Sequence, residues 1–205
     1  MTDAGLKHLR GLTQLRTLGL ASIRVTDAGL EHLQTLTQLQ EVDLIGPTLT
    51  DAGLHYLKTV TKLRKLMLRG PGFTDVGLEY LKSLTNVNVS NVGPTPIETE
   101  VPRIRTLVLC DTAITDKGLS RIGDFTNLQT LYVGGPHVTN AGLVDLSRLG
   151  KLRSLGLVSA GFTDAGLEHL KTLTELQELN LHGTPVTDAG VAELQKALPN
   201  CKISR

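Results

Sequence analysis

A few residues have types and spacings that could support chemistry. Histidines recur at one position of a repeating pattern, and imidazole nitrogens can hold zinc: His8, His32 and His169. Arginines recur at a second position, and guanidinium groups can engage phosphates: Arg16, Arg64, Arg105 and Arg153. A thiol and an imidazole, Cys110 and His182, could form a nucleophilic pair if they met.

The spacing of these residues argues against each activity. The histidines fall on separate predicted helices, and packed helices lie roughly 8–10 Å apart, too far for two rings to reach one zinc ion at ~2.1 Å. The arginines alternate with neutral residues, the net charge is only +1, and aromatic residues, which stack on nucleic-acid bases, make up 3% of the chain. Cys110 and His182 fall on strands that are three apart. We therefore predict that the chain has no catalytic, cofactor-binding or metal site, does not bind nucleic acid and is not an enzyme.

A repeated unit explains why these residues recur. The stretch from Thr163 to Val186 reads TDAGLEHLKTLTELQELNLHGTPV. Its first leucines are three residues apart, as on one face of a helical turn, and Leu179 and Leu181 have the two-residue period of a strand. Each unit is therefore predicted to form one helix and one short strand, and a stack of units to share a continuous core.

The same frame divides the whole chain, residues 1–205, into repeats of a single domain. The units are residues 2–25, 26–49, 50–73, 74–97, a short unit 98–114, then 115–138, 139–162, 163–186 and a C-terminal partial unit 187–205 that we expect to act as a cap. Strands pack ~4.8 Å apart and helices roughly 8–10 Å apart, so the stack must curve with its strands inside.

This pattern, L-x-x-L-x-L with a period of about 24 residues, resembles that of the leucine-rich-repeat proteins. The T-D-A-G-L repeats look like the bacterial form, related to a cysteine-containing, F-box-like subclass. The resemblance implies an α/β solenoid, a right-handed curved superhelix with a parallel sheet on the concave side and helices on the convex side. Ile23, Pro47 and Pro71 occupy the position of the subclass cysteine.

Every unit except the short unit 98–114 opens with Thr followed by Asp or Asn, and carries glycine three positions after the Thr. We expect the Thr to cap a helix and the Asp to favour the positive end of its dipole. Glycine inside a helix costs about 1 kcal/mol relative to alanine, so its recurrence predicts a close approach between neighbouring backbones. Cys110 and Cys201 fall four strands apart and are predicted to be free thiols.

The repeat is irregular between Thr74 and Ile114. We favour a full unit 74–97 with a weak strand around Val87, Ser90 and Val92, followed by a short unit that lacks a helix. The alternative register places Leu84, Val87 and Val89 in the strand and leaves residues 90–103 as a loop. Both interpretations predict a gap in the outer layer between helices near 75–84 and 116–125.

The strand positions that alternate with the leucines should form the inner face. Its middle part combines apolar residues with charged ones, as protein contact surfaces do. The predicted partner-binding residues are Glu41, Asp43, Ile45, Lys65, Met67, Arg69, Val108 and Tyr132.

We therefore predict a non-catalytic module that binds a protein partner through its concave face. The alternatives are the substrate-recognition region of an F-box-like ubiquitin ligase system and a fragment of a larger surface or adhesion protein. No signal or transmembrane segment is visible in this chain, which favours the cytoplasm. Unit 2–25 lacks a preceding strand, so self-association through an uncapped N-terminal end is a further expectation.

Overall fold

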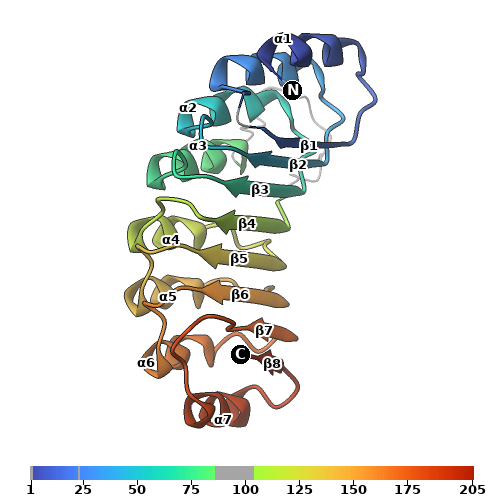
Figure 1. Cartoon of the computed structure of the whole chain (residues 1–205). Helices are drawn as coiled ribbons and strands as arrows, with labels where there is room; N and C mark the ends of the chain where they lie inside the picture. Colours follow the sequence, from blue (N-terminus) through green and yellow to red (C-terminus); the bar gives the residue numbers. More distant parts are fainter. Residues whose placement is uncertain (1, 23, 86–103) are drawn as a thin grey trace, which may run out of the picture.

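A computed structural model describes residues 2–22, 24–85 and 104–205 of the chain. Its strands form one parallel sheet in which each strand pairs with the next one along the chain (Figure 1). The strands are β1 (Thr17–Ala21), β2 (Glu41–Ile45), β3 (Lys65–Arg69), β4 (Thr106–Cys110), β5 (Thr130–Gly134), β6 (Ser154–Val158), β7 (Glu178–Asn180) and β8 (Lys202–Ser204).

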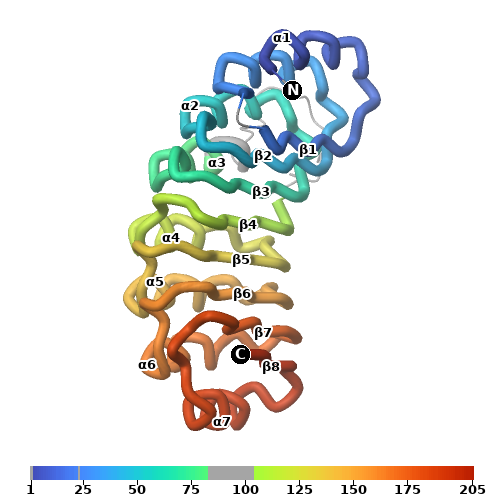
Figure 2. The backbone as a smooth tube through the Cα atoms, in the orientation of Figure 1, coloured from blue at the N-terminus to red at the C-terminus, as the bar shows by residue number. Residues whose placement is uncertain are grey.

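Short helices form a second layer, and several of them are wholly or partly of the tighter 3₁₀ type. The α-helices are α1 (Asp3–Leu6), α2 (Asp51–Leu54), α3 (Asp75–Thr85), α4 (Asp116–Ile122), α5 (Asn140–Leu146), α6 (Asp164–Leu167) and α7 (Asp188–Ala197). The 3₁₀ helices are η1 (Lys7–Gly11), η2 (Asp27–Thr35), η3 (His55–Thr59) and η4 (Glu168–Leu170). The backbone follows a shallow arc with the sheet on its inner side and the helices on its outer side (Figure 2). The predicted solenoid is therefore confirmed.

Leucines fill the space between the two layers. Along β2, β3, β4 and β5, buried residues alternate with half-buried or exposed ones, as in Lys65–Arg69, where Leu66 and Leu68 are buried. Because the strands pair in register, the buried residues of neighbouring repeats stack into continuous rows, such as Val42, Leu66, Leu107 and Leu131. A core shared in this way stabilises units that could not bury their apolar side alone.

The Asp that follows each Thr has a role that the sequence analysis missed. Asp27 accepts hydrogen bonds from the Thr50 backbone N–H at 2.8 Å and from the Thr50 hydroxyl at 2.5 Å, so its carboxylate joins one repeat to the next. The same pair of bonds recurs along the helical layer at Asp3–Thr26, Asp51–Thr74, Asp75–Thr115, Asp116–Thr139 and Asp164–Thr187. We call this series the Asp–Thr ladder. Asn140 makes the equivalent bonds to Thr163 with its amide group.

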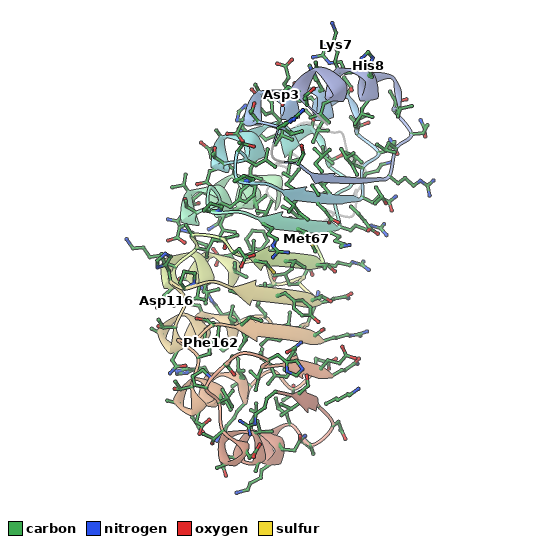
Figure 3. All side chains as sticks on the ribbon, in the orientation of Figure 1. Asp3, Lys7, His8, Met67, Asp116 and Phe162 are labelled. Carbon is green, nitrogen blue, oxygen red and sulfur yellow. The ribbon has the colours of Figure 1, made fainter. Side chains whose placement is uncertain are left out.

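The predicted caps are present in part of the array. The hydroxyls of Thr50, Thr115, Thr139 and Thr187 accept a backbone N–H of the first helical turn, whereas those of Thr2, Thr26 and Thr163 do not. The carboxylates of the ladder are the more regular feature. Figure 3 places Asp116 in the helical layer and Met67 at the sheet.

The recurring glycine leaves room for the Asp carboxylate of the preceding repeat. We had expected it to leave room for a neighbouring backbone. A Cβ atom at Gly53 would lie 2.5 Å from Asp27 Oδ1 and 2.6 Å from Leu30 Cδ1. Equivalent contacts with the preceding repeat occur at Gly29, Gly77, Gly118, Gly142, Gly166 and Gly190. The approach that excludes a side chain is therefore between a helix and the Asp of the repeat before it.

The interpretation of residues 74–114 was wrong in one respect. β3 pairs directly with β4, with Lys65 opposite Thr106, so no strand of a separate 74–97 unit lies between them in the sheet. Paired residues are 41 positions apart here, against 24 between β2 and β3. The proposed strand residues Val87, Val89, Ser90 and Val92, and the boundary between units 74–97 and 98–114, lie outside the described residues.

The predicted gap in the outer layer is also absent from the described part of the chain. Asp75 of α3 accepts hydrogen bonds from Thr115 at the start of α4, at 2.8 Å and 2.7 Å. Arg121 of α4 donates to the Asp75 carbonyl oxygen at 2.9 Å and lies 2.7 Å from a Glu79 carboxylate oxygen. The two helices are neighbours, because the ladder spans the longer repeat as it spans the shorter ones.

The strand predicted near Ile203 is present in the sheet. β8 pairs with β7, and Arg205 bonds Asp188 at 2.8 Å and the Val186 carbonyl oxygen at 2.7 Å. Arg205 therefore binds the Asp188 carboxylate. In earlier repeats the equivalent Asp carboxylate binds the Thr of the next repeat. Cys110 and Cys201 are both free thiols, as predicted.

Candidate protein-binding face

The predicted partner-binding residues all lie at the strand positions that alternate with buried core residues. We call the surface formed by these positions the inner face. Arg69 is exposed and the others are half-buried: Glu41, Asp43 and Ile45 on β2, Lys65 and Met67 on β3, Val108 on β4 and Tyr132 on β5. Core residues flank them, and Leu66 and Leu131 are fully buried. The strand pairing therefore places the predicted residues on four adjacent strands.

Three apolar side chains are brought into direct succession. Met67 pairs with Val108, and Val108 pairs with Tyr132, in the parallel register of β3, β4 and β5. We call these three residues the apolar row. The Tyr132 ring lies over Gly156 of β6, whose missing side chain leaves room for it. The ring thus extends the apolar row across a fourth strand.

Ion pairs border this row. Lys65 Nζ lies 3.6 Å from Glu41 Oε2 and 4.0 Å from Asp43 Oδ1. On the other side of the row, Arg69 Nε donates to Asp111 Oδ2 at 2.8 Å. Ion pairs this exposed contribute little to the stability of the fold, about 0–1 kcal/mol each.

Asp111 belongs to this surface and was missed by the sequence analysis. It has a left-handed backbone conformation with a φ of 52°, at the position where the preceding repeat has Gly70 with a φ of 146°. Asp tolerates this conformation better than most side chains do. Its contact with Arg69, 42 residues away, depends on the direct pairing of β3 with β4, which the sequence interpretation did not place correctly.

Cys110 and Val158 also lie on the inner face, beyond the predicted set. Burial, followed by the Asp111 carboxylate, raises the pKa of the Cys110 thiol, and Arg69 lowers that pKa to a smaller extent. The thiol is therefore protonated at neutral pH and is a poor nucleophile. Val158 is 48% exposed at the end of β6, a degree of exposure that strand alternation alone does not indicate.

The other residues with chemical potential do not converge. Within the described residues, no group of three His, Cys, Asp or Glu side chains is placed to hold a metal ion. The histidines His8, His32 and His169 lie in separate helices, η1, η2 and η4. None of the helices in residues 2–22, 24–85 and 104–205 has the length and apolar character needed to cross a bilayer.

The likeness to known proteins lies in the fold. No protein-family model and no curated protein sequence matches the chain. Among solved structures, the chain is similar to an internalin (inlF) from Listeria monocytogenes str. 4b F2365, with a TM-score of 0.66 and 22% sequence identity. The match covers 96% of this chain and 49% of the internalin chain, so this chain spans about half the length of that protein. The likeness does not separate the T-D-A-G-L subclass from other leucine-rich repeats. In-register parallel strands, one helical segment for each strand and a shared leucine core give this chain the leucine-rich-repeat solenoid fold.

Proposed function

We propose that this chain is a non-catalytic interaction module that binds a protein partner through its inner face. The observation that carries the proposal is the apolar row of Met67, Val108 and Tyr132, which lies on an open sheet surface and is bordered by ion pairs.

This arrangement matches the anatomy of a protein interface. Interfaces place apolar and aromatic side chains at the centre and charged groups at the rim, where water remains. Tyr and Met are enriched at such centres, and a few aromatic anchors supply most of the binding energy. The strands hold these side chains on a fixed framework, so little ordering cost is added when a partner binds.

A double substitution tests the proposal. Met67→Glu with Tyr132→Glu places two carboxylates in the apolar row, so proteins held by this surface should be lost. Affinity capture from cells that make the protein, with quantitative mass spectrometry, should give a set of proteins retained by wild type and depleted by at least about tenfold with the variant, because buried interface anchors are each worth 2 kcal/mol or more.

A matched control substitutes exposed valines on the helical layer. Val76 in α3 is 56% exposed and Val144 in α5 is 49% exposed, so Val76→Glu with Val144→Glu adds the same charge on the opposite layer. This control should retain the same proteins as wild type. Retention of those proteins by the Met67→Glu/Tyr132→Glu variant, with an unchanged melting temperature, would show that the inner face is the wrong surface.

A further inference from the structure

A row of arginines borders the inner face along the side where the strands begin. Each arginine occupies the position just before its strand, and the members are Arg16, Arg64, Arg105 and Arg153. We call this set the arginine row. Figure 1 shows that the strand starts line up along one side of the molecule.

The backbone fixes this row firmly. The Arg105 N–H donates to the Arg64 carbonyl oxygen at 2.8 Å, so these two residues are direct neighbours. Gln40 links Arg16 to Arg64, and Gln129 links Arg105 to Arg153, through backbone bonds of 2.7–2.8 Å. At ~4.8 Å for each strand, the row spans ~24 Å from Arg16 to Arg153.

The side chains of the arginine row are exposed and have no acceptor within the described part of the chain. Cations of the helical layer behave differently. Arg121 pairs with Glu79 at 2.7 Å, Lys171 with Glu168 at 2.7 Å and Arg148 with Asp124 at 3.0 Å. On the sheet side, the Glu41 and Asp43 carboxylates already face Lys65. Among residues 2–22, 24–85 and 104–205, no acidic side chain pairs with the arginine row, so these four guanidinium groups are open to a partner's carboxylates.

We propose that the arginine row and the apolar row together bind an extended acidic segment of a protein partner that runs along the solenoid across the strands. Arg64 and Arg105 each precede a member of the apolar row, Met67 or Val108, by three residues. An extended chain points successive side chains to opposite sides. Carboxylates on one side would then reach the arginine row, and apolar side chains on the other would reach the apolar row.

The dimensions set the length and pattern of the segment. A span of ~24 Å corresponds to about seven residues of extended chain, with acidic and apolar residues in alternation. A carboxylate can accept two parallel hydrogen bonds from one guanidinium, which favours arginine over lysine in this role. A nucleic acid fits less well, because Tyr132 is the one aromatic residue of the described inner face on which a base could stack.

The inference rests on the proposed function, and a defined probe tests it. The probe is a fluorescein-labelled peptide, Glu-Val-Glu-Val-Glu-Val-Glu, titrated with the whole chain and followed by fluorescence anisotropy in low salt. The control peptide, Val-Val-Val-Glu-Glu-Glu-Glu, has the same composition and charge. The wild-type protein should bind the alternating peptide more tightly, and added salt should weaken binding because exposed charges are screened.

Two charge variants locate the site. Arg64→Gln with Arg105→Gln should weaken binding of the alternating peptide by about tenfold, as expected for the loss of two rim charges. Lys7→Gln with Lys117→Gln removes the same charge from exposed positions of the helical layer and should change the affinity by less than about twofold. Absence of binding by wild type, equal loss in both variants, or equal affinity for the two peptides would overturn the inference.

The outcomes separate this inference from the function on which it rests. If the Arg64→Gln/Arg105→Gln variant binds the peptide as wild type does, while Met67→Glu/Tyr132→Glu loses its cellular partners, the arginine row is not a binding site and the inner face still is. A seven-nucleotide single-stranded DNA that competes as well as the alternating peptide would show a site for any polyanion and would also overturn the inference.

Discussion

The Asp carboxylate of each repeat does two tasks with its two oxygens. In Asp51, Oδ1 accepts the Thr74 backbone N–H at 2.9 Å and Oδ2 accepts the Thr74 hydroxyl at 2.5 Å. The first bond satisfies a donor at a helix start that has no intrahelical partner, and the negative charge lies near the positive end of the next helix dipole. One residue therefore fixes both the start of a helix and its position against the preceding repeat.

Asn140 is the one described member of the Asp–Thr ladder without a carboxylate, so replacing it with Asp tests how much the charge contributes to stability. Asn140→Asp restores the charge while keeping the acceptor for the Thr163 N–H, which Asn140 Oδ1 now receives at 2.9 Å. The variant should be more stable at neutral pH by about 0.3–1 kcal/mol, the usual range for an anion near a helix start. Urea unfolding followed by circular dichroism measures this difference. A loss of stability would mean that charge does not strengthen the ladder.

The ladder should also make stability depend on pH. Hydrogen bonds from the Thr187 hydroxyl and backbone N–H lower the pKa of Asp164 below its ordinary value of 3.8. A carboxyl whose folded pKa is depressed contributes stability above its unfolded pKa and loses that contribution as pH falls through the folded pKa.

Asp164→Asn removes this titration while keeping the geometry that Asn140 displays. The stability difference between wild type and Asp164→Asn should be largest at pH 7 and should shrink from about pH 4 downward, because the wild-type carboxyl becomes protonated there. Urea unfolding at pH 7 and at pH 3 tests this expectation. A difference that stays constant over this range would contradict it.

At the scale of elements, the glycine that recurs three positions after each Thr explains why each helix packs closely against the preceding repeat. A Cβ at Gly77 would approach Leu54 Cδ1 to 2.9 Å and would also meet Asp51 Oδ1. Glycine lowers helix stability by about 1 kcal/mol relative to alanine. This loss is offset because the absence of a side chain lets the Asp carboxylate reach the next helix.

A pair of glycine substitutions separates packing from propensity. Gly53→Ala should destabilise the protein by about 1–3 kcal/mol, because overpacking outweighs the gain in helix propensity. Gly11→Ala in η1 is the control, since a Cβ there meets nothing within 4 Å. Thermal and urea unfolding should show a loss only for Gly53→Ala. A neutral or stabilising result at Gly53 would mean that the Asp27 side chain moves aside without cost.

Elements with a strong leucine period could be predicted from the sequence, and those without it could not. The strands at Leu66–Leu68 and Leu131–Val133 follow from alternation and pair as predicted. The sequence after α3 contains scattered valines with no clear period, so the local pattern alone left two registers open. The pairing of β3 with β4 is set by contacts between distant residues, such as Asp75 with Thr115, which the sequence pattern did not reveal.

At the scale of the whole molecule, each repeat contacts mainly its neighbours. In such arrays stability is approximately a sum of terms for repeats and for the interfaces between them. Gly53→Ala should therefore increase amide hydrogen exchange in α2, β2 and β3, with little change in β7 and β8. Exchange followed by mass spectrometry tests this, and a uniform increase over the array would indicate that the solenoid opens as one unit.

The inner face illustrates what the sequence could predict of a site. Alternation placed Met67, Val108 and Tyr132 on one surface, and the sheet register brings them together. The bond between Arg69 and Asp111 and the packing of Tyr132 on Gly156 could not be predicted, because they require three-dimensional positions. Whether these residues bind a partner stays a prediction.

The long repeat between β3 and β4 has a structural consequence. It is 17 residues longer than the step from β2 to β3, yet the sheet register and the Asp75–Thr115 contact are both kept. The described framework therefore accommodates steps of unequal length, and the distance along the chain between successive strands is not what sets their pairing. Side-chain contacts and strand register, rather than an equal count of residues, align one turn of the coil with the next.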